Sequence, residues 1–275
     1  MRLRLRPRAA LAALAVLCVV AWLDGTAAAA PVRVAAVFDR DAALGGSTAL
    51  DVRLRLDPSQ LTRAPLTEVR FAYPRSLGLV SSGLGLATCT RPASDFAQVL
   101  IVAPRLGGCP PNAVMGFGTA LALVRLTNGQ VIPEYAAVTV LSGPFEHGRL
   151  GLVVFVDGQR PFGAKLAFRG EVGDAPAPYG GALTVRMPMV PGLEELATIS
   201  LVELRITIGS HAIRYYERRG GQQVAYRPTG VELPLRCPAG GFRFRAQVRF
   251  ADHSRRSALS STPCPPAFAS PSSGR

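Results

Sequence analysis

A short run near the C-terminus alternates apolar residues with arginines and constrains the fold more than any other stretch. Residues 242–250 read Phe-Arg-Phe-Arg-Ala-Gln-Val-Arg-Phe. Side chains on a β-strand point to opposite faces at a period of two, whereas a helix would scatter these residues around its surface. The pattern therefore predicts a strand with one apolar, mostly aromatic face and one strongly basic face.

This strand is the first half of a predicted hairpin with a cysteine at each end. Residues 252–254 (Asp-His-Ser) supply side chains that form turns with their own backbone, and residues 257–262 form the return strand. Cys237 precedes the first strand and Cys264 follows the second. Because the ends of an antiparallel pair come together, a disulfide is predicted here, with a stabilising effect of roughly 3–4 kcal/mol.

The chain opens with the features of a secretory signal peptide. Four arginines precede an unbroken apolar run from Ala9 to Leu23, and small residues follow at 27–30. This plan predicts a leader over residues 1–29, with cleavage near Ala29. The apolar run is shorter than the ~20 residues that a membrane-spanning helix needs, and no later stretch is long enough. We therefore expect a secreted or envelope-associated protein without a transmembrane segment, and an uncleaved anchor is the alternative.

Four cysteines remain after the leader, and an even number in an exported chain indicates disulfides. Three connectivities are open, and proximity in the sequence favours Cys89–Cys109 together with Cys237–Cys264. The spacing lacks the Cys-x-x-Cys pairs typical of zinc sites. No metal is expected.

Bursts of β-branched and aromatic residues between glycines and prolines are typical of an all-β protein. We predict an immunoglobulin-like β-sandwich in two disulfide-stapled halves, residues 30–143 and 144–267, followed by a disordered tail at 268–275. The boundary is placed at Ser142-Gly143-Pro144. Hairpin turns are predicted at Asn128-Gly129 and at Asp157-Gly158.

Two groups of residues resemble a known kind of protein. The first is Ala87-Thr88-Cys89 with Cys109-Pro110 and the glycine-rich run at 115–120. The second is 235–238 with 241–244, 250–252 and 262–264. Together they are similar to a group of uncharacterised exported β-rich proteins of high-GC actinobacteria. The resemblance implies secretion and a disulfide-bonded β-sandwich, and it implies no activity.

The chain of 275 residues has a formal net charge of +13, and most of this excess survives removal of the leader. Lys165 is the only lysine, so all the other positively charged side chains counted here are arginines. Such a surface attracts polyanions such as wall polymers, anionic lipid or nucleic acid, although arginine on solvated strand faces can also reflect codon usage alone. The candidate anion-binding residues are Arg243, Arg245 and Arg249. A second basic cluster includes the tyrosines 215, 216 and 226.

Motifs for catalysis are weak. The histidines at 147, 211 and 253 form no His-Glu-x-x-His motif, and no Gly-x-Ser-x-Gly elbow or phosphate-binding glycine loop is present. Glu194-Glu195 is the one adjacent carboxylate pair, and it lies in a predicted loop. We therefore predict no catalytic residues and no cofactor.

Three functions remain open. The first is a non-enzymatic envelope or extracellular binding module that engages an anionic cell-wall polymer. The second is a structural or assembly protein whose partner is another envelope protein. Nucleic acid is not expected as a partner, because the protein is predicted to be exported. The third is a hydrolase with a dispersed site, which a pocket of converging carboxylates or histidines would favour.

Overall fold

A computed structural model of the chain describes residues 31–58, 64–79, 87–90, 108–161, 165–187, 197–209, 213–227 and 230–267. The predicted leader at 1–29 and the predicted tail at 268–275 lie outside the described residues. So do His211 and the Glu194-Glu195 pair.

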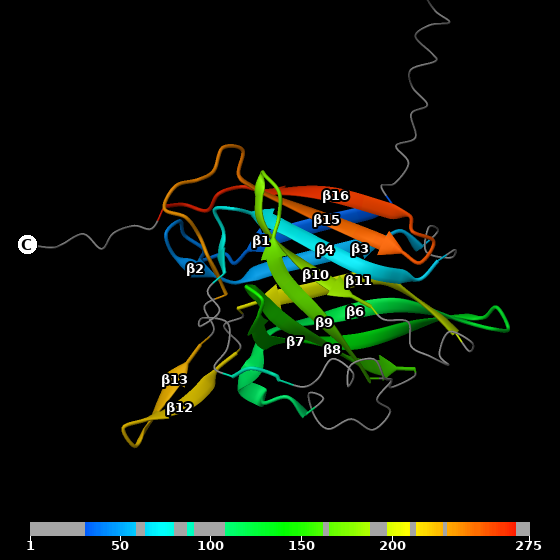
Figure 1. Cartoon of the computed structure of the whole chain (residues 1–275), viewed down its shortest axis with the longest axis horizontal. Coiled ribbons are helices and arrows are strands. Elements are labelled where there is room, and N and C mark those ends of the chain that lie inside the picture. The colour runs from blue at the N-terminus through cyan, green and yellow to red at the C-terminus, as the bar shows by residue number, and fades with distance from the viewer. Residues whose placement is uncertain are drawn as a thin grey trace, which may run out of the picture. The chain divides into compact units, whose positions relative to one another are not determined.

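The described part of the chain is all-β, as predicted, and most of it belongs to one eleven-stranded sheet (Figure 1). In spatial order the strands are β1 (Val32–Phe38), β3 (Leu50–Leu56), β11 (Ala197–Ile208), β6 (Val114–Leu126), β7 (Val131–Glu146), β8 (Arg149–Arg160), β9 (Lys165–Asp174), β10 (Tyr179–Arg186), β4 (Leu66–Pro74), β15 (Phe242–Phe250) and β16 (Arg255–Thr262).

Two small sheets and one 3₁₀ turn complete the described structure. A hairpin pairs β12 (Tyr215–Arg219) with β13 (Gln222–Tyr226). A three-stranded sheet has the order β2 (Ser47–Thr48), β14 (Val231–Glu232) and β5 (Gly78–Leu79). The turn, η5 (Pro111–Ala113), leads into β6.

The large sheet curls into a nearly closed barrel with β1 and β16 at its two edges. Every neighbouring pair is antiparallel, so an odd number of strands leaves the two edges running in the same direction. Across this seam the Thr262 hydroxyl donates a hydrogen bond to the Ala36 carbonyl. Beyond the strands, the Leu44 amide donates to the Pro266 carbonyl at 2.9 Å. The side chains of β1 and β15 also pack together beneath the seam.

The apolar face of β15 builds the core at one end of the barrel. Phe242 and Phe244 have no exposed surface. The Phe242 ring meets Phe38 edge-on with centroids 4.9 Å apart, and the Phe244 ring stacks on Phe71 at 5.5 Å. The intervening arginines lie on the outer face. The prediction of a strand with an aromatic inner face and a basic outer face is confirmed.

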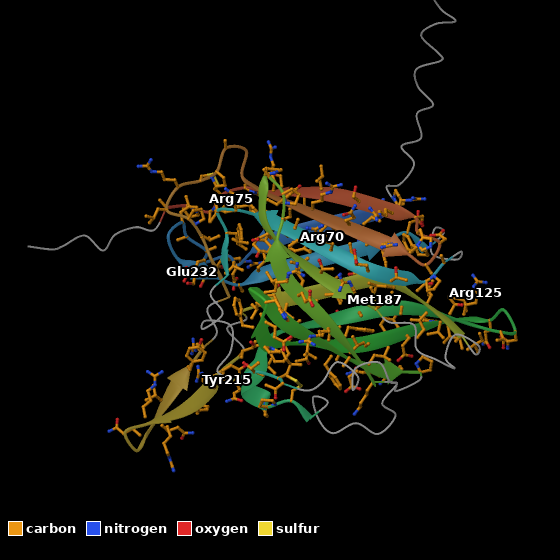
Figure 2. The ribbon with its side chains drawn as sticks, viewed as in Figure 1. Arg70, Arg75, Arg125, Met187, Tyr215 and Glu232 are labelled. Atoms are coloured by element: carbon orange, nitrogen blue, oxygen red, sulfur yellow. A yellow bond between two sulfur atoms is a disulfide. The ribbon has the colours of Figure 1, made fainter. Side chains whose placement is uncertain are left out.

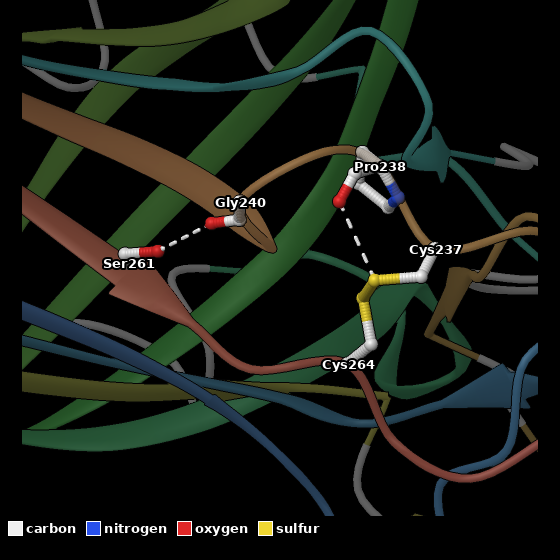
Figure 3. Close-up of a disulfide and its surroundings, with 5 residues drawn as sticks. All are labelled: Cys237, Pro238, Gly240, Ser261 and Cys264. Atoms are coloured by element: carbon white, nitrogen blue, oxygen red, sulfur yellow. Dashed lines mark hydrogen bonds between the residues drawn. A yellow bond between two sulfur atoms is a disulfide. The ribbon is translucent and has the colours of Figure 1, made fainter.

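Both predicted disulfides are present. Cys89 bonds Cys109, and Cys237 bonds Cys264 with their Cα atoms 5.8 Å apart. Figure 3 shows the second bridge beside the end of the β15–β16 hairpin, where the Ser261 hydroxyl donates a 3.0 Å hydrogen bond to the Gly240 carbonyl. The bridge therefore ties the two ends of the hairpin together.

Replacing both Cys237 and Cys264 by alanine is expected to lower the free energy of unfolding by roughly 3 kcal/mol, because the unfolded chain loses a closed loop. Urea unfolding of the oxidised protein and of the double variant measures the difference. A loss below about 1 kcal/mol would show that the hairpin holds its ends together without the covalent link.

The predicted division into two halves is corrected by the structure. The described residues from Pro31 onward form one compact unit, and Ser142–Pro144 lies within β7. The register shift between Ser142 and Phe145 is a bulge that lets the strand continue through glycine and proline. Strands from both sides of this point alternate in one continuous sheet, so the immunoglobulin-like sandwich is not confirmed.

Of the turns predicted at Asn128-Gly129 and Asp157-Gly158, the first is confirmed and the second is wrong. Gly129 has a φ of 84° in the turn between β6 and β7, a conformation that favours glycine. Asp157 and Gly158 lie inside β8 instead, where Asp157 pairs with Lys165 on β9. The strand continues because β7 and β9 flank it on both sides at this level.

Candidate apolar binding site

The interior of the barrel contains a cavity of about 590 Å³ that is lined almost wholly by hydrocarbon side chains. Every strand of the large sheet except β16 contributes to its wall. Pockets that hold small molecules measure roughly 300–1,000 Å³ and are mostly apolar. This cavity is the candidate functional site.

The apolar wall of the cavity is formed by alternate side chains of each strand, as β8 illustrates. Leu152 and Val154 line the cavity, whereas Val153 and Phe155 point to the other face and pack in a cluster with Cys89. Residues between 150 and 156 are therefore almost continuously apolar, because this part of the sheet is covered on both faces. The first disulfide belongs to the outer cover.

On β11 a bulge keeps the apolar side chains inside. Ile199 and Leu201 line the cavity before the register shift at Leu201/Glu203, and Leu204 and Ile206 line it afterwards. One extra residue changes which alternate positions face inward. The residues that face the cavity therefore have odd numbers before the bulge and even numbers after it, and Glu203 lies on the outer face.

Small residues on neighbouring strands leave the interior unfilled. Ala120 on β6 pairs with Ala136 on β7, which in turn pairs with Gly158 on β8. Ala122 lies two residues further along β6, and all four line the cavity. A barrel of about eight strands is just filled by its side chains, so eleven strands with small residues on one side leave room for a ligand.

One end of the cavity is closed by packed core. Val231 on β14 and Leu77 line the cavity at this end, and both are at most 4% exposed. They belong to the same cluster as Phe242 and Phe244. The small sheet that contains β2, β14 and β5 therefore caps the barrel here.

Two titratable side chains, Tyr73 and Glu134, reach the cavity from different ends of the barrel. Tyr73 lies on β4 opposite Gly181 of β10, where a side chain larger than hydrogen would collide with the tyrosine ring. Burial, and then the negative charge of Asp174, raise the pKa of Tyr73, so its hydroxyl stays protonated. Glu134 lies near the start of β7, away from the cap.

The described lining residues are almost all apolar. They include one carboxylate and no histidine, cysteine or serine. An apolar molecule in such a cavity would gain affinity by leaving water, at about 25 cal/mol per Å² of apolar surface buried.

A second, smaller pocket of about 290 Å³ contains Glu146, His147 and Glu171 near the β7–β8 turn. This is the kind of grouping that the hydrolase hypothesis requires. Each carboxylate, however, pairs with an arginine: Glu146 accepts from Arg169 at 2.8 Å, and Glu171 from Arg149 at 3.3 Å. Both glutamate side chains are about half exposed, which is typical of solvated ion pairs on a sheet surface. The hydrolase stays an untested alternative.

A charge cluster on the outer face of β3 and β11 centres on Glu203, whose carboxylate pairs with Arg53, Arg55 and Arg205. Burial alone would raise the pKa of Glu203. The hydrogen bonds from Arg205 and Arg55, together with their positive charges, outweigh burial and lower this pKa below 4.5.

Stability is therefore expected to depend on Glu203 in acid. A lowered folded pKa gives a stabilising contribution that is complete above pH 4.5 and is lost as the pH falls through the folded value. The variant Glu203→Gln should lose no more than about 1 kcal/mol of unfolding free energy at pH 7, because water screens the exposed arginines. Its unfolding free energy should also fall less between pH 7 and pH 3 than that of the parent protein. Urea unfolding at pH 7 and pH 3 tests this. Equal acid sensitivity of the two proteins would contradict it.

The predicted anion-binding residues share one outer face and do not line the cavity. Arg243 and Arg245 are exposed, and Arg249 is half-buried with its guanidinium 3.3 Å from His253 Nδ1. Figure 2 labels Arg70 on the neighbouring strand β4, which pairs with β15. Anion binding by these arginines stays a prediction.

The predicted tyrosine cluster divides between packing and solvent. Tyr215 and Tyr226 stack with ring centroids 6.3 Å apart, and Tyr215 packs against the outer cluster that contains Cys89. Burial, and then Tyr226, raise the pKa of Tyr215. Tyr216 is 59% exposed on the other face of the hairpin. The hairpin thus presents one aromatic side chain to solvent.

Comparisons of the chain with protein-family models, with curated proteins and with solved structures found no match. Within the described ranges, no helix has the length and apolarity needed to cross a membrane. The geometry of the site is that of an apolar chamber inside a nearly closed, disulfide-bonded barrel.

Proposed function

We propose that the protein is an exported, non-enzymatic binding protein that holds an apolar molecule inside its barrel. The observation that carries this proposal is the cavity of about 590 Å³ with its hydrocarbon lining. A closely packed core has few voids larger than a water molecule, because each one forfeits dispersion contacts. A chamber of this size is a cost to stability that binding would offset.

The chemistry of the wall favours a mainly hydrocarbon ligand, such as an acyl chain or an alicyclic molecule. Tyr73 and Glu134 offer polar contacts toward different ends, and the wall between them is apolar. Pockets of this kind obtain affinity from apolar contact and orientation from a few polar groups. Ligands with several charges would lose more hydration than the wall could replace.

Export is part of the proposal and is supported by the leader pattern at residues 1–29 and by the two disulfides. Membership of the exported actinobacterial β-rich group stays a prediction, as does an immunoglobulin-like arrangement. Engagement of an anionic wall polymer and assembly with another envelope protein also stay predictions, and both concern the outer surface.

Titration with N-phenyl-1-naphthylamine, a neutral apolar fluorophore, tests the proposal. We expect fluorescence enhancement that saturates at one molecule per chain with a dissociation constant in the micromolar range. Long-chain fatty alcohols should displace the probe, and short-chain alcohols should not, because affinity grows with the apolar surface buried. Absence of a saturable signal would contradict an apolar binding function.

A further inference from the structure

The outer face of four neighbouring strands, β10, β4, β15 and β16, is strongly basic. The register places six arginines on this surface, which we call the arginine face: Arg70, Arg186, Arg243, Arg245, Arg249 and Arg255. The outward positions of these strands, all of them described, include one carboxylate. This is Glu68, whose Oε2 lies 3.7 Å from Arg186 Nε. The face therefore carries a large excess of positive charge.

An exposed leucine lies within the arginine face. Leu259 on β16 pairs directly with Arg245 and is 73% exposed. Across the seam, where Thr262 hydrogen-bonds to Ala36, the edge strand β1 carries the exposed Arg33. A single exposed leucine is ordinary on a protein surface. Here, however, arginines flank it on both sides.

We infer that the arginine face docks on the surface of an anionic lipid bilayer. Guanidinium groups bind lipid phosphates through paired hydrogen bonds, and each cation held near an anionic bilayer adds to the affinity. An apolar side chain among the cations can enter the boundary between headgroups and acyl chains. The outer face of the sheet thus offers charge and an apolar anchor in one plane.

The leucine distinguishes a bilayer from a soluble polyanion. A dissolved wall polymer would pair with the arginines but offers no hydrocarbon for Leu259 to enter, whereas a bilayer offers both. The inference does not depend on occupancy of the cavity, since the two sites lie on opposite sides of the sheet.

Vesicle co-sedimentation tests the inference. The chain from Ala30 onward, which contains the whole compact unit, is mixed with vesicles of phosphatidylcholine alone or with 30% phosphatidylglycerol. We expect binding to the anionic vesicles only. The triple variant R243Q/R245Q/R255Q should bind roughly 100-fold more weakly, at about fivefold for each cation removed. Leu259→Ser should weaken binding about fivefold.

A matched control removes three exposed arginines elsewhere. The variant R125Q/R160Q/R218Q has the same net charge as R243Q/R245Q/R255Q but keeps the arginine face; Figure 2 labels Arg125 beside the β6–β7 hairpin. We expect its affinity to stay within about threefold of the parent protein, because distant charges are screened at physiological salt. Circular dichroism and urea unfolding establish that every variant is folded.

Three results would overturn the inference. The first is equal loss of binding in the two triple variants, which would show that only net charge matters. The second is absence of binding to anionic vesicles. The third is binding to soluble polyphosphate as tight as to vesicles, with no effect of Leu259→Ser on either, which would assign the face to a dissolved polyanion.

Discussion

Replacing Ala136 by phenylalanine is expected to weaken the binding of N-phenyl-1-naphthylamine by about 100-fold. Ala136 lies between Ala120 and Gly158 on neighbouring strands, at the centre of the small residues that leave the cavity open. A phenyl ring there would occupy space that the ligand needs, and a tenfold loss corresponds to only 1.4 kcal/mol of lost contact. Fluorescence titration of the two proteins measures the effect.

Ala137→Phe provides the matched control. Ala137 is the next residue on β7 and faces the other side of the sheet, so the same added ring should leave probe affinity within about twofold. Overpacking costs roughly 1–3 kcal/mol in a filled core, but Ala136→Phe enters open space and should cost little stability. Equal effects of the two variants on binding would show that the probe does not occupy the cavity.

The largest loss of stability is expected from Phe244→Ala, which should lower the free energy of unfolding by about 3–5 kcal/mol. Phe244 is fully buried and stacks on Phe71 of β4, and its ring centroid lies 6.3 Å from that of Phe38 on β1. Removing the ring leaves a void between β15, β4 and β1, and these paired strands cannot move together to fill it. The change also loosens the packing that closes the seam.

Arg245→Ala is the control for this prediction, because Arg245 is adjacent on β15 and lies on the outer face. Its cost should stay within about 0.5 kcal/mol, as for most surface substitutions. Urea unfolding midpoints measure both variants. If Phe244→Ala lost less than about 1.5 kcal/mol, the aromatic cluster would not be the core that holds this end of the barrel.

Local patterns in the sequence were sufficient to predict several elements. The alternation of residues 242–250, the Asn128-Gly129 turn and the pairing of Cys237 with Cys264 all depend on residues close together in the chain. A period of two, a turn that needs positive φ and a short loop between cysteines are each visible without knowledge of distant contacts. These predictions are confirmed, and none of them depends on contacts between distant segments of the chain.

The failures concern contacts between distant segments. Gly143 and Pro144 look like a domain boundary, but β8 pairs along this part of β7 and carries the strand through a bulge. The order of the sheet places β4 between β10 and β15, although these strands are more than 100 residues apart from it in sequence. No local pattern shows such neighbours, so one sheet was mistaken for two halves.

The cavity was missed for the same reason. Ala120, Ala122 and Ala136 are unremarkable in the sequence, and they define a chamber only once β6 and β7 are paired and the sheet has curled. One signal was present: small residues at inward positions of long strands predict an unfilled interior. Only part of the arginine face was evident in the sequence. Arg70 and Arg186 belong to it because β4 pairs with β15 and β10 pairs with β4.

Methyl NMR of the protein with a ¹³C-labelled fatty alcohol tests the central claim most directly. The account predicts intermolecular NOEs from the alkyl chain to methyl groups that line the cavity, such as those of Leu152, Val154 and Leu183. The exposed methyl groups of Leu235 and Leu259 should give none and serve as controls within the same sample. NOEs confined to the exposed leucines, or absent from both sets at saturating ligand, would contradict an apolar site inside the barrel.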